Sequence, residues 1–410
     1  MRFLHVADLH IGKVVNDFSM LEDQKFVLEQ IAGMARANSV DAVVIAGDIY
    51  DRAIPPGEAV ALFDAFLTKL AGQGTKTIMI SGNHDSPERI GFGADLLCKQ
   101  GVHIGAVVKK ELDRAVFKED GVETEFVLLP FVKPAWLGVR NSGEAVSLLL
   151  SAYWQEEACR GYGDGKMPGG MQAGAGDGAE PEDRAETAGK KNRVLVTHFF
   201  VTDGGREPEL SDSESTIHVG GLDNVDAGLF EGFDYVALGH IHKSQQIGGR
   251  PVWYAGAPLK YSFGETAQTK AVLLVETGRE GLKEVRKLEI RPLREMRKVK
   301  GTLKEILDGA DGAMGQGGQD YIQAILTDRG ELIDPIGTIR SVYPNVMQIV
   351  REEPDSSFRL NKDGGNQSRI LAEKKDTLAL FEAFYQEVRD NDLSVEGKKA
   401  LVDIVKELEG

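Results

Sequence analysis

Short apolar runs alternate with longer amphipathic stretches along the first 155 residues. Each run spans four or five residues and ends at a polar or turn residue, which is typical of a buried strand. The runs lie at 3–7, 42–46, 77–80 and 126–129. Between the second and third runs, apolar side chains recur at helical i, i+3, i+4 spacing from Ala59 to Leu70. Strands that alternate with helices predict a layered α/β architecture.

Two local signals refine this pattern. Ser19 and Glu22 have the spacing of a capping box, which predicts that a helix begins there. Residues 161–192 contain nine glycines between positions 161 and 189, and they offer almost no apolar side chains to bury. We therefore expect a flexible surface insertion at 161–192.

The strand pattern resumes after the insertion and changes again near residue 290. Further strands are predicted at 194–197, 235–238, 252–255 and 271–275, so that residues 1–285 form one large domain. A small α+β domain is predicted at 286–354, with a strand at 321–326. A polar linker at 355–369 then leads to two amphipathic helices within 370–410.

Composition and charge limit the function. The 410 residues carry a formal net charge of −16, which argues against a simple basic nucleic-acid binder but not against an enzyme that binds divalent cations. The two cysteines exclude a disulfide scaffold and fit a reducing cytoplasm. No apolar run reaches 18 residues, so we expect no membrane-spanning helix.

Chemically active side chains follow five of the predicted strands. Because ligands bind at the carboxyl ends of strands in α/β sheets, we expect these side chains to meet in one crevice. The candidate ligands are Asp8, His10, Asp48, Asn83, His198, His240 and His242. Seven oxygen and nitrogen ligands suit two divalent cations about 3.5–4 Å apart better than one tetrahedral ion. Asp48 is the natural bridging carboxylate.

The motifs that carry these ligands resemble a known family. Asp-x-His, Gly-Asp, Gly-Asn-His-Asp, a single His and Gly-His-x-His occur in that order at 8–10, 47–48, 82–85, 198 and 239–242. This series resembles the calcineurin-like metallophosphoesterase superfamily. The resemblance implies an α/β fold with a layered β-sandwich flanked by helices, a small α+β capping domain and C-terminal helices.

Two longer segments resemble one branch of that superfamily, the DNA double-strand-break repair nucleases. They are residues 3–12, and residues 238–242 together with 254–263. Asp51 stands where archaeal and eukaryotic relatives usually carry a further histidine, which favours the bacterial branch.

The resemblance also implies a division of the ligands between two metal positions, usually filled by manganese. One position takes Asp8, His10, Asp48 and His242, and the other takes Asp48, Asn83, His198 and His240. The ligand types alone equally permit iron, zinc or cobalt.

Two further residues have implied roles in catalysis. His84 contacts the scissile phosphate and the leaving 3′ oxygen, and Asp85 orients the His84 imidazole. The alternative for Asp85 is a helix N-cap for the segment that begins near Pro87.

The resemblance implies DNA as substrate and an ATPase subunit as partner. Exonuclease action on double-stranded ends and endonuclease action on hairpin or single-stranded DNA are expected. The helices within 370–410 would dock on the coiled coil of the ATPase, or else fold back on their own domain. Helices near 57–72 and 87–100 would join two copies into a homodimer within a heterotetramer.

Two other functions stay open at this point. One is a different phosphodiesterase or phosphatase of the same superfamily, acting on a small molecule or a phosphoprotein. The other is a scaffold protein with an inactive site.

Overall fold

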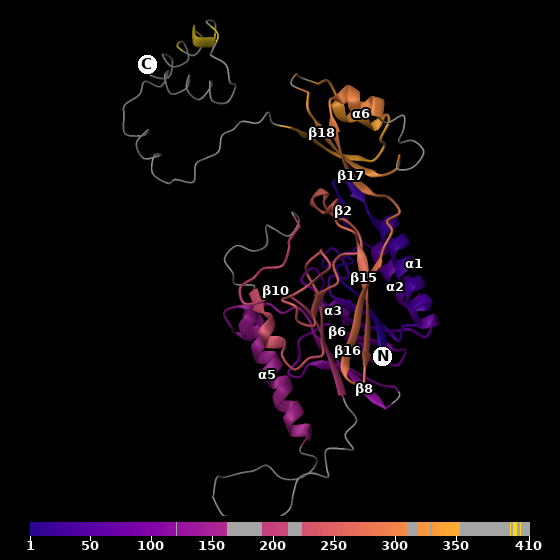
Figure 1. The fold of residues 1–410 in the computed structure, drawn as a ribbon, viewed down its shortest axis with the longest axis vertical. Coiled ribbons are helices and arrows are strands. Elements are labelled where there is room, and N and C mark those ends of the chain that lie inside the picture. The colour runs from indigo at the N-terminus through magenta and orange to yellow at the C-terminus, as the bar shows by residue number, and fades with distance from the viewer. Residues whose placement is uncertain are drawn as a thin grey trace, which may run out of the picture. The chain divides into compact units, whose positions relative to one another are not determined.

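In the computed structural model, two six-stranded sheets form the centre of the protein (Figure 1). In spatial order, the first sheet consists of β16 (Gly281–Glu289), β15 (Ala271–Gly278), β1 (Arg2–Val6), β4 (Ala42–Ala46), β5 (Lys76–Ile80) and β6 (Val102–Gly105). The second consists of β13 (Gln245–Gln246), β14 (Val252–Tyr254), β12 (Tyr235–Gly239), β9 (Lys191–His198), β8 (Val122–Leu129) and β7 (Asp113–Glu119). Side chains from both sheets, among them Phe3 and Phe126, share one apolar core, so the sheets pack face to face.

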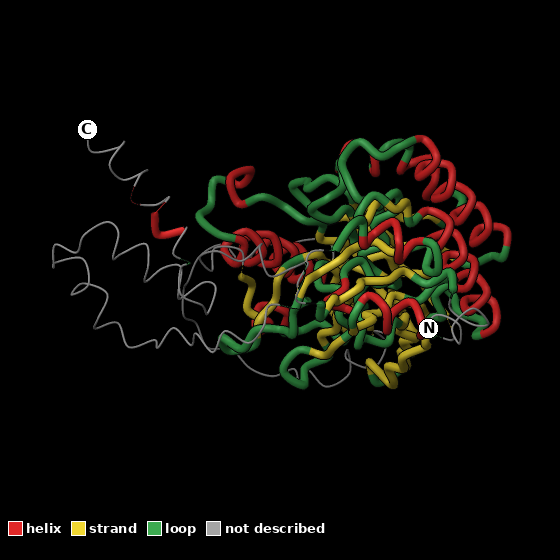
Figure 2. Tube along the Cα trace, turned by 90° about the horizontal axis from the view of Figure 1, so that it is seen from above, coloured by secondary structure: helices red, strands yellow, loops and turns green. Residues whose placement is uncertain are grey.

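Helices cover the outer faces of this sandwich. α1 (Leu21–Ala37) and α2 (Gly57–Gly72) pack on the first sheet, and α5 (Ser142–Gly161) packs on the second. Figure 2 shows from above that helices border the strands. Because both faces of the central strands are covered, β4 is apolar at every position and wholly buried. The predicted α/β layering and the sandwich flanked by helices are thus confirmed.

The remaining short elements connect these layers. They are α3 (Pro87–Ile90), α4 (Ala94–Cys98), η1 (Pro134–Leu137), η2 (Ala227–Phe230), η3 (Phe263–Glu265), and the strand pairs β2 (Val14–Val15) with β3 (Phe18–Ser19) and β10 (Phe200–Thr202) with β11 (Asn224–Asp226). Among the described residues, no helix has the length and apolar character needed to cross a membrane.

A separate, three-stranded sheet follows the sandwich. It contains the parallel strands β17 (Met296–Gly301), β18 (Tyr321–Leu326) and β19 (Val346–Arg351), with α6 (Leu303–Gly309) and α7 (Pro335–Arg340). These elements have a small apolar core of their own. They also contact α1, because the Asp23 carboxylate accepts hydrogen bonds from the Tyr321 hydroxyl at 2.7 Å and from Arg294 at 2.8 Å.

The structure describes residues 1–119, 121–161, 191–211, 224–309, 318–328, 330, 332–352, 394, 397–399 and 402. Met1–Glu352 form one compact unit and Glu353–Gly410 a second. The predicted linker at 355–369, nearly all of the predicted helices within 370–410, and the insertion from 162 to 190 lie outside the described residues. The boundary near residue 285 stays a prediction.

Two predictions of detail differ from the structure. The prediction of a capping box at Ser19 and Glu22 is wrong, because the N-cap of α1 is Met20, which makes no side-chain hydrogen bond to the helix. The Glu22 carboxylate instead accepts a hydrogen bond from Arg294 at 2.5 Å. The insertion is also shorter than expected, since Gly161 ends α5 and residues 191–192 begin β9.

Candidate metal centre

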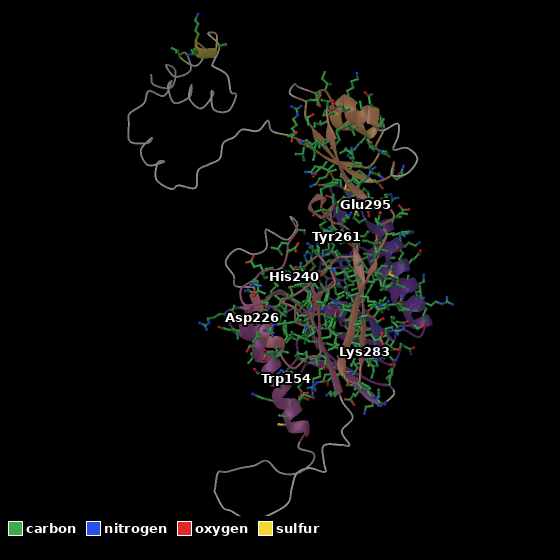
Figure 3. The ribbon with its side chains drawn as sticks, in the orientation of Figure 1. Trp154, Asp226, His240, Tyr261, Lys283 and Glu295 are labelled. Carbon is green, nitrogen blue, oxygen red and sulfur yellow. The ribbon has the colours of Figure 1, made fainter. Side chains whose placement is uncertain are left out.

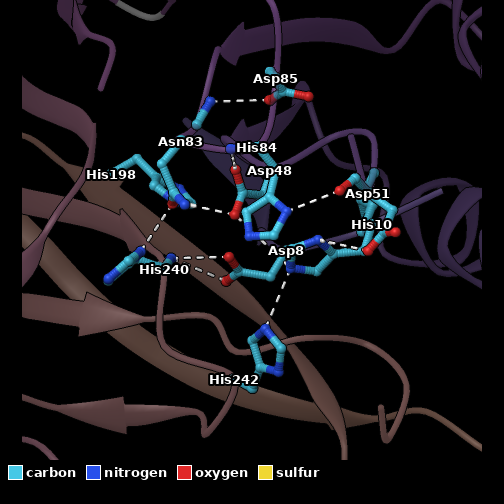
Figure 4. Close-up of polar contacts among 12 residues, drawn as sticks. Asp8, His10, Asp48, Asp51, Asn83, His84, Asp85, His198, His240 and His242 are labelled. Carbon is cyan, nitrogen blue, oxygen red and sulfur yellow. Dashed lines mark hydrogen bonds and ion pairs between the residues drawn. The ribbon is translucent and has the colours of Figure 1, made fainter. Parts of the chain in front are cut away.

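All seven predicted ligands lie at the carboxyl ends of strands, and the structure brings them around one centre (Figure 4). The first sheet supplies Asp8, His10, Asp48 and Asn83, and the second supplies His198, His240 and His242. The candidate ligands expected at the edge of one sheet therefore come from the edges of two sheets. The label of His240 in Figure 3 shows where this centre lies in the molecule.

The backbone of the ligand turns is unusual. Asp8, His10, Asp48 and His240 have φ values of 53°, 45°, 51° and 102°, a region that few residues other than glycine adopt. Backbone hydrogen bonds fasten two of these turns together, from Asp8 N to the Gly47 carbonyl at 3.1 Å and from His10 N to the Asp48 carbonyl at 3.0 Å. Backbone strain of this kind persists where the surrounding structure compensates for it, and it gathers at functional sites.

Position 82 requires glycine, because Asp48 lies too close for a side chain there. A methyl group there would overlap the Asp48 carboxylate, because the turn after β5 passes directly over that side chain. The glycine of the Gly-Asn-His-Asp motif therefore allows Asp48 and Asn83 to lie in one site.

Four candidate ligand atoms converge on one side of the centre. The Asn83 Oδ1 lies 3.0 Å from His198 Nε2 and 3.0 Å from His240 Nδ1, and the Asp48 Oδ2 lies 3.3 Å from His198 Nε2. The other ring nitrogen of His198 faces the Ala46 carbonyl at 2.8 Å and must donate to it, so in the neutral ring Nε2 carries the lone pair. Acceptor atoms gathered in this way fit a cation between them.

A second group of donors lies beside the first. The Nε2 atoms of His10 and His242 are 3.2 Å apart, and His10 Nε2 is 3.8 Å from the Asp48 Oδ2. Ligand atoms of Asp8, His10 and His242 lie within 4.8 Å of one another, as do those of Asp8, Asp48 and His198. Asp8, His10, Asp48, His198 and His242 are buried, whereas Asn83 and His240 are partly exposed. Carboxylate, imidazole and carboxamide without thiolate suit Mn²⁺, Fe²⁺, Co²⁺ or Zn²⁺, and Asp48 reaches both groups.

Burial and close charges shift the pKa values of the ligands. Burial, with Asp48 adding to it, raises the pKa of Asp8 to about 7 against the opposing effect of His198 and His242. Burial also disfavours the charged Asp48, but His198 and His10 outweigh it and lower the Asp48 pKa below its ordinary value. Burial alone would lower the pKa of His198, yet Asp48 raises it to about 9.

His84 and Asp85 lie beside the ligands with different partners from those predicted. The His84 Nδ1 contacts the carbonyl oxygen of Asp51 at 2.8 Å, and the His84 main-chain N–H donates to Asp48 Oδ1 at 2.9 Å. The Asp85 carboxylate accepts from the backbone N–H groups of Ile49 at 3.1 Å, Tyr50 at 2.9 Å and Gly82 at 2.9 Å.

The prediction that Asp85 orients the His84 ring is therefore wrong. The N-cap alternative is also wrong, because the N-cap of α3 is Ser86. Asp85 instead ties the turn after β4 to the turn after β5, since its two oxygens accept from backbone groups of both.

Sequence reasoning missed two groups that support the ligands. Gln24 on α1 accepts from Gly12 N at 2.9 Å and donates to the His10 carbonyl at 2.7 Å, which fastens the first ligand turn. Glu265 is fully buried with one oxygen 3.5 Å from His242 Nδ1. Burial would raise the pKa of Glu265, but His242 and Lys270 lower it to about 2. No motif in the sequence marks either residue.

Comparisons with known proteins agree with this geometry. The family described as Calcineurin-like phosphoesterase matches residues 1–130, and the family described as Type 5 capsule protein repressor C-terminal domain matches residues 292–389. The chain is 28% identical over 398 residues to the D subunit of the nuclease SbcCD from Staphylococcus epidermidis, an alignment that covers 96% of this chain and 95% of the relative.

Two solved structures are also similar to part of the chain. The protein TT1561 of Thermus thermophilus has a TM-score of 0.36 at 12% identity and covers 71% of this chain and 99% of its own. A dimetal phosphatase from Danio rerio has a TM-score of 0.35 at 14% identity and covers 71% of this chain and 98% of its own. Scores this low carry no weight for the fold, which rests on the sheet topology and the family matches. The phosphoesterase match contains the first ligand motifs and the SbcCD nuclease chain aligns with almost the whole sequence, so this chain is similar to calcineurin-like phosphoesterases and to SbcD-type subunits.

Proposed function

We propose that this protein is the metal-dependent nuclease subunit of an SbcCD-type complex and hydrolyses DNA phosphodiester bonds. The observation that carries the proposal is the convergence of seven metal-ligand side chains from both sheets, in a chain that aligns over 96% of its length with a nuclease subunit. The family match over residues 1–130 supports the same reaction class.

The proposed ligands of one ion are Asp8, His10, Asp48 and His242. Those of the other are Asp48, Asn83, His198 and His240. Manganese is the proposed ion at both positions. When bound, such ions polarise phosphoryl oxygens and lower the pKa of a coordinated water toward neutrality.

His84 is the proposed proton donor to the leaving 3′ oxygen. Its Nδ1 donates to the Asp51 carbonyl, since a carbonyl oxygen only accepts, and this leaves Nε2 as the nitrogen that can exchange a proton. The contact also fixes the ring plane beside His10, at 4.7 Å between ring centroids. His84 is only partly buried, so a substrate can reach it.

The proposed assembly contains DNA, a homodimer of this chain and an SbcC-type ATPase, together a cytoplasmic heterotetramer. The net charge of −16 supports a shared grip on DNA, because an acidic chain by itself gains little from releasing counterions. The helices predicted within 370–410 are the proposed docking segment for the ATPase. A chain cut at residue 370 should keep cleavage of simple substrates and should no longer co-purify with the ATPase.

The experiment that tests the nuclease activity compares substrates. We expect Mn²⁺-dependent degradation of linear duplex DNA and opening of DNA hairpins, which EDTA abolishes. Bis-p-nitrophenyl phosphate and a phosphopeptide are the matched probes for a small-molecule phosphodiesterase and a protein phosphatase. Faster turnover of either probe than of DNA would contradict the proposal.

A further inference from the structure

The histidines of the metal centre have unequal partners behind them. The His242 Nδ1 lies 3.5 Å from a Glu265 oxygen, and the His10 Nδ1 lies 3.9 Å from an Asp51 oxygen. The His198 Nδ1 instead faces the neutral Ala46 carbonyl at 2.8 Å. The two imidazoles proposed for one ion thus face carboxylates, whereas an imidazole proposed for the other faces a backbone carbonyl.

A lysine holds each of these two carboxylates in place. Lys270 Nζ is 2.6 Å from Glu265, and both side chains are almost completely buried. Lys270 also donates to the His242 carbonyl at 3.0 Å, so the lysine and the carboxylate contact the same ligand residue. Lys13 Nζ is 2.7 Å from Asp51, where both groups are closer to solvent.

Further hydrogen bonds fix the Glu265 carboxylate. It accepts from the Ser262 hydroxyl at 3.1 Å and from Tyr261 N at 3.3 Å. Asp51 interacts more weakly with His10. The 3.9 Å between the His10 Nδ1 and the Asp51 oxygen is too long for a hydrogen bond, so only the charge of Asp51 acts on the ring. Glu265 is therefore the better placed of the two.

A carboxylate behind an imidazole has two effects on a bound metal. It keeps the proton on Nδ1, which leaves the Nε2 lone pair for the metal, and its charge raises the basicity of that lone pair. The Ala46 carbonyl behind His198 provides the first effect without a full negative charge. His242 and His198 consequently differ in donor strength.

We infer that Glu265 is a positioning residue for His242 and, with a smaller contribution from Asp51, makes the His10–His242 side the tighter of the two metal positions. The inference rests on the proposed function, since it presupposes two bound ions. Glu265 acts through His242 and does not itself ligate the metal.

Calorimetric titration with Mn²⁺ of the full-length, EDTA-treated protein tests the inference. We expect two classes of site in the unaltered chain. Glu265→Gln should weaken the tighter class by about 10- to 100-fold, the usual effect of losing such a carboxylate, and leave the weaker class unchanged.

A double-mutant cycle separates positioning from a general structural effect. In an Asn83→Ala background, which removes a ligand of the other ion, Glu265→Gln should still weaken the remaining site. In a His242→Ala background it should have no further effect, because the ligand through which Glu265 acts is gone. Equal weakening in both backgrounds, or no weakening in either, would overturn the inference.

Two control variants separate an effect on Mn²⁺ affinity from other effects of the substitution. Glu295→Gln removes another carboxylate paired with a lysine, Lys260 at 2.6 Å, and should leave Mn²⁺ affinity unchanged. If Glu265→Gln unfolds the chain by leaving Lys270 unpaired, the variant Glu265→Gln with Lys270→Met removes both charges and should show the same loss of affinity. An unaltered protein that binds fewer than two ions would refute the proposed function and the inference together, whereas two ions insensitive to Glu265 would refute the inference alone.

Discussion

Two groups of charged side chains lie at different ends of β9, and they differ in how their charges are balanced. Near the start of β9, Arg114 contacts Glu125 at 3.3 Å, Glu156 at 2.6 Å and Glu157 at 2.5 Å. Lys191 and Arg193 of β9 add contacts to Glu157 at 2.9 and 3.4 Å. We call Arg114, Glu125, Glu156, Glu157, Lys191 and Arg193 the ionic cluster; its three cations match its three carboxylates.

The metal centre at the other end of β9 lacks this internal balance. Its seven candidate ligands include Asp8 and Asp48 but neither lysine nor arginine, and their oxygen and ring nitrogen atoms face one another. Figure 3 labels Trp154 beside the ionic cluster and His240 in the metal centre. The Trp154 ring lies 5.5 Å from the Arg193 guanidinium. The difference teaches that the fold tolerates charge that side chains compensate, whereas buried donors without such compensation favour a bound cation.

The largest expected effect comes from Asp48→Asn. This change keeps the shape of the side chain but removes the charge shared by both metal positions, so Mn²⁺ binding and DNA cleavage should fall to the level of the metal-free protein. Calorimetry and a nuclease assay measure the two losses. The metal-free variant should unfold at the same temperature as the unaltered protein or higher, and a large fall in that temperature would mean that Asp48 acts mainly in the fold.

His84→Ala should reduce cleavage while both ions stay bound. We expect a fall of about 10²- to 10⁴-fold, the usual contribution of a general acid. Titration of the same preparation should still give two Mn²⁺ per chain. Equal loss of metal in His84→Ala and Asp48→Asn would remove the distinction between proton donor and ligand.

Arg114→Met tests the other half of the comparison. It leaves the carboxylates of the ionic cluster without their main cation, and Glu125 is almost fully buried. The free energy of unfolding should fall by about 3 kcal/mol in urea titrations. Mn²⁺ affinity and the cleavage rate of the folded variant should not change; an altered Mn²⁺ affinity would show that the two groups are coupled.

The smallest expected effect concerns His5, which lies in the sandwich core and contacts the Tyr235 hydroxyl at 2.9 Å. Burial lowers its pKa to about 3, opposed by a backbone hydrogen bond with Leu238. Between pH 6.5 and 3 the unfolded chain therefore binds a proton that the folded chain does not, so stability falls as the pH falls. In metal-free protein, this histidine should lower the free energy of unfolding by about 2 kcal/mol at pH 5 relative to pH 7.

His5→Asn provides the comparison for that pH dependence. The variant should lose less stability than the unaltered chain between about pH 7 and about pH 5 in urea titrations without metal. Identical losses would mean that His5 is protonated in the folded state.

The sequence was sufficient for most of the central strands and for the candidate ligands that the structure brings around one centre. Buried strands appear as short apolar runs, and His198 or Asp48 can be recognised because each directly follows such a run. These are local properties of the chain, set by the two-residue period of a strand and by the polar residue that ends it.

Only the tertiary structure decided which partner each ligand has. His84 contacts the Asp51 carbonyl rather than Asp85, His198 contacts Ala46, 152 residues away, and Glu265 lies behind His242. Such contacts depend on the register of neighbouring strands and on the packing of two sheets. Sequence spacing encodes neither, because residues that are distant along the chain become neighbours only when the sandwich closes.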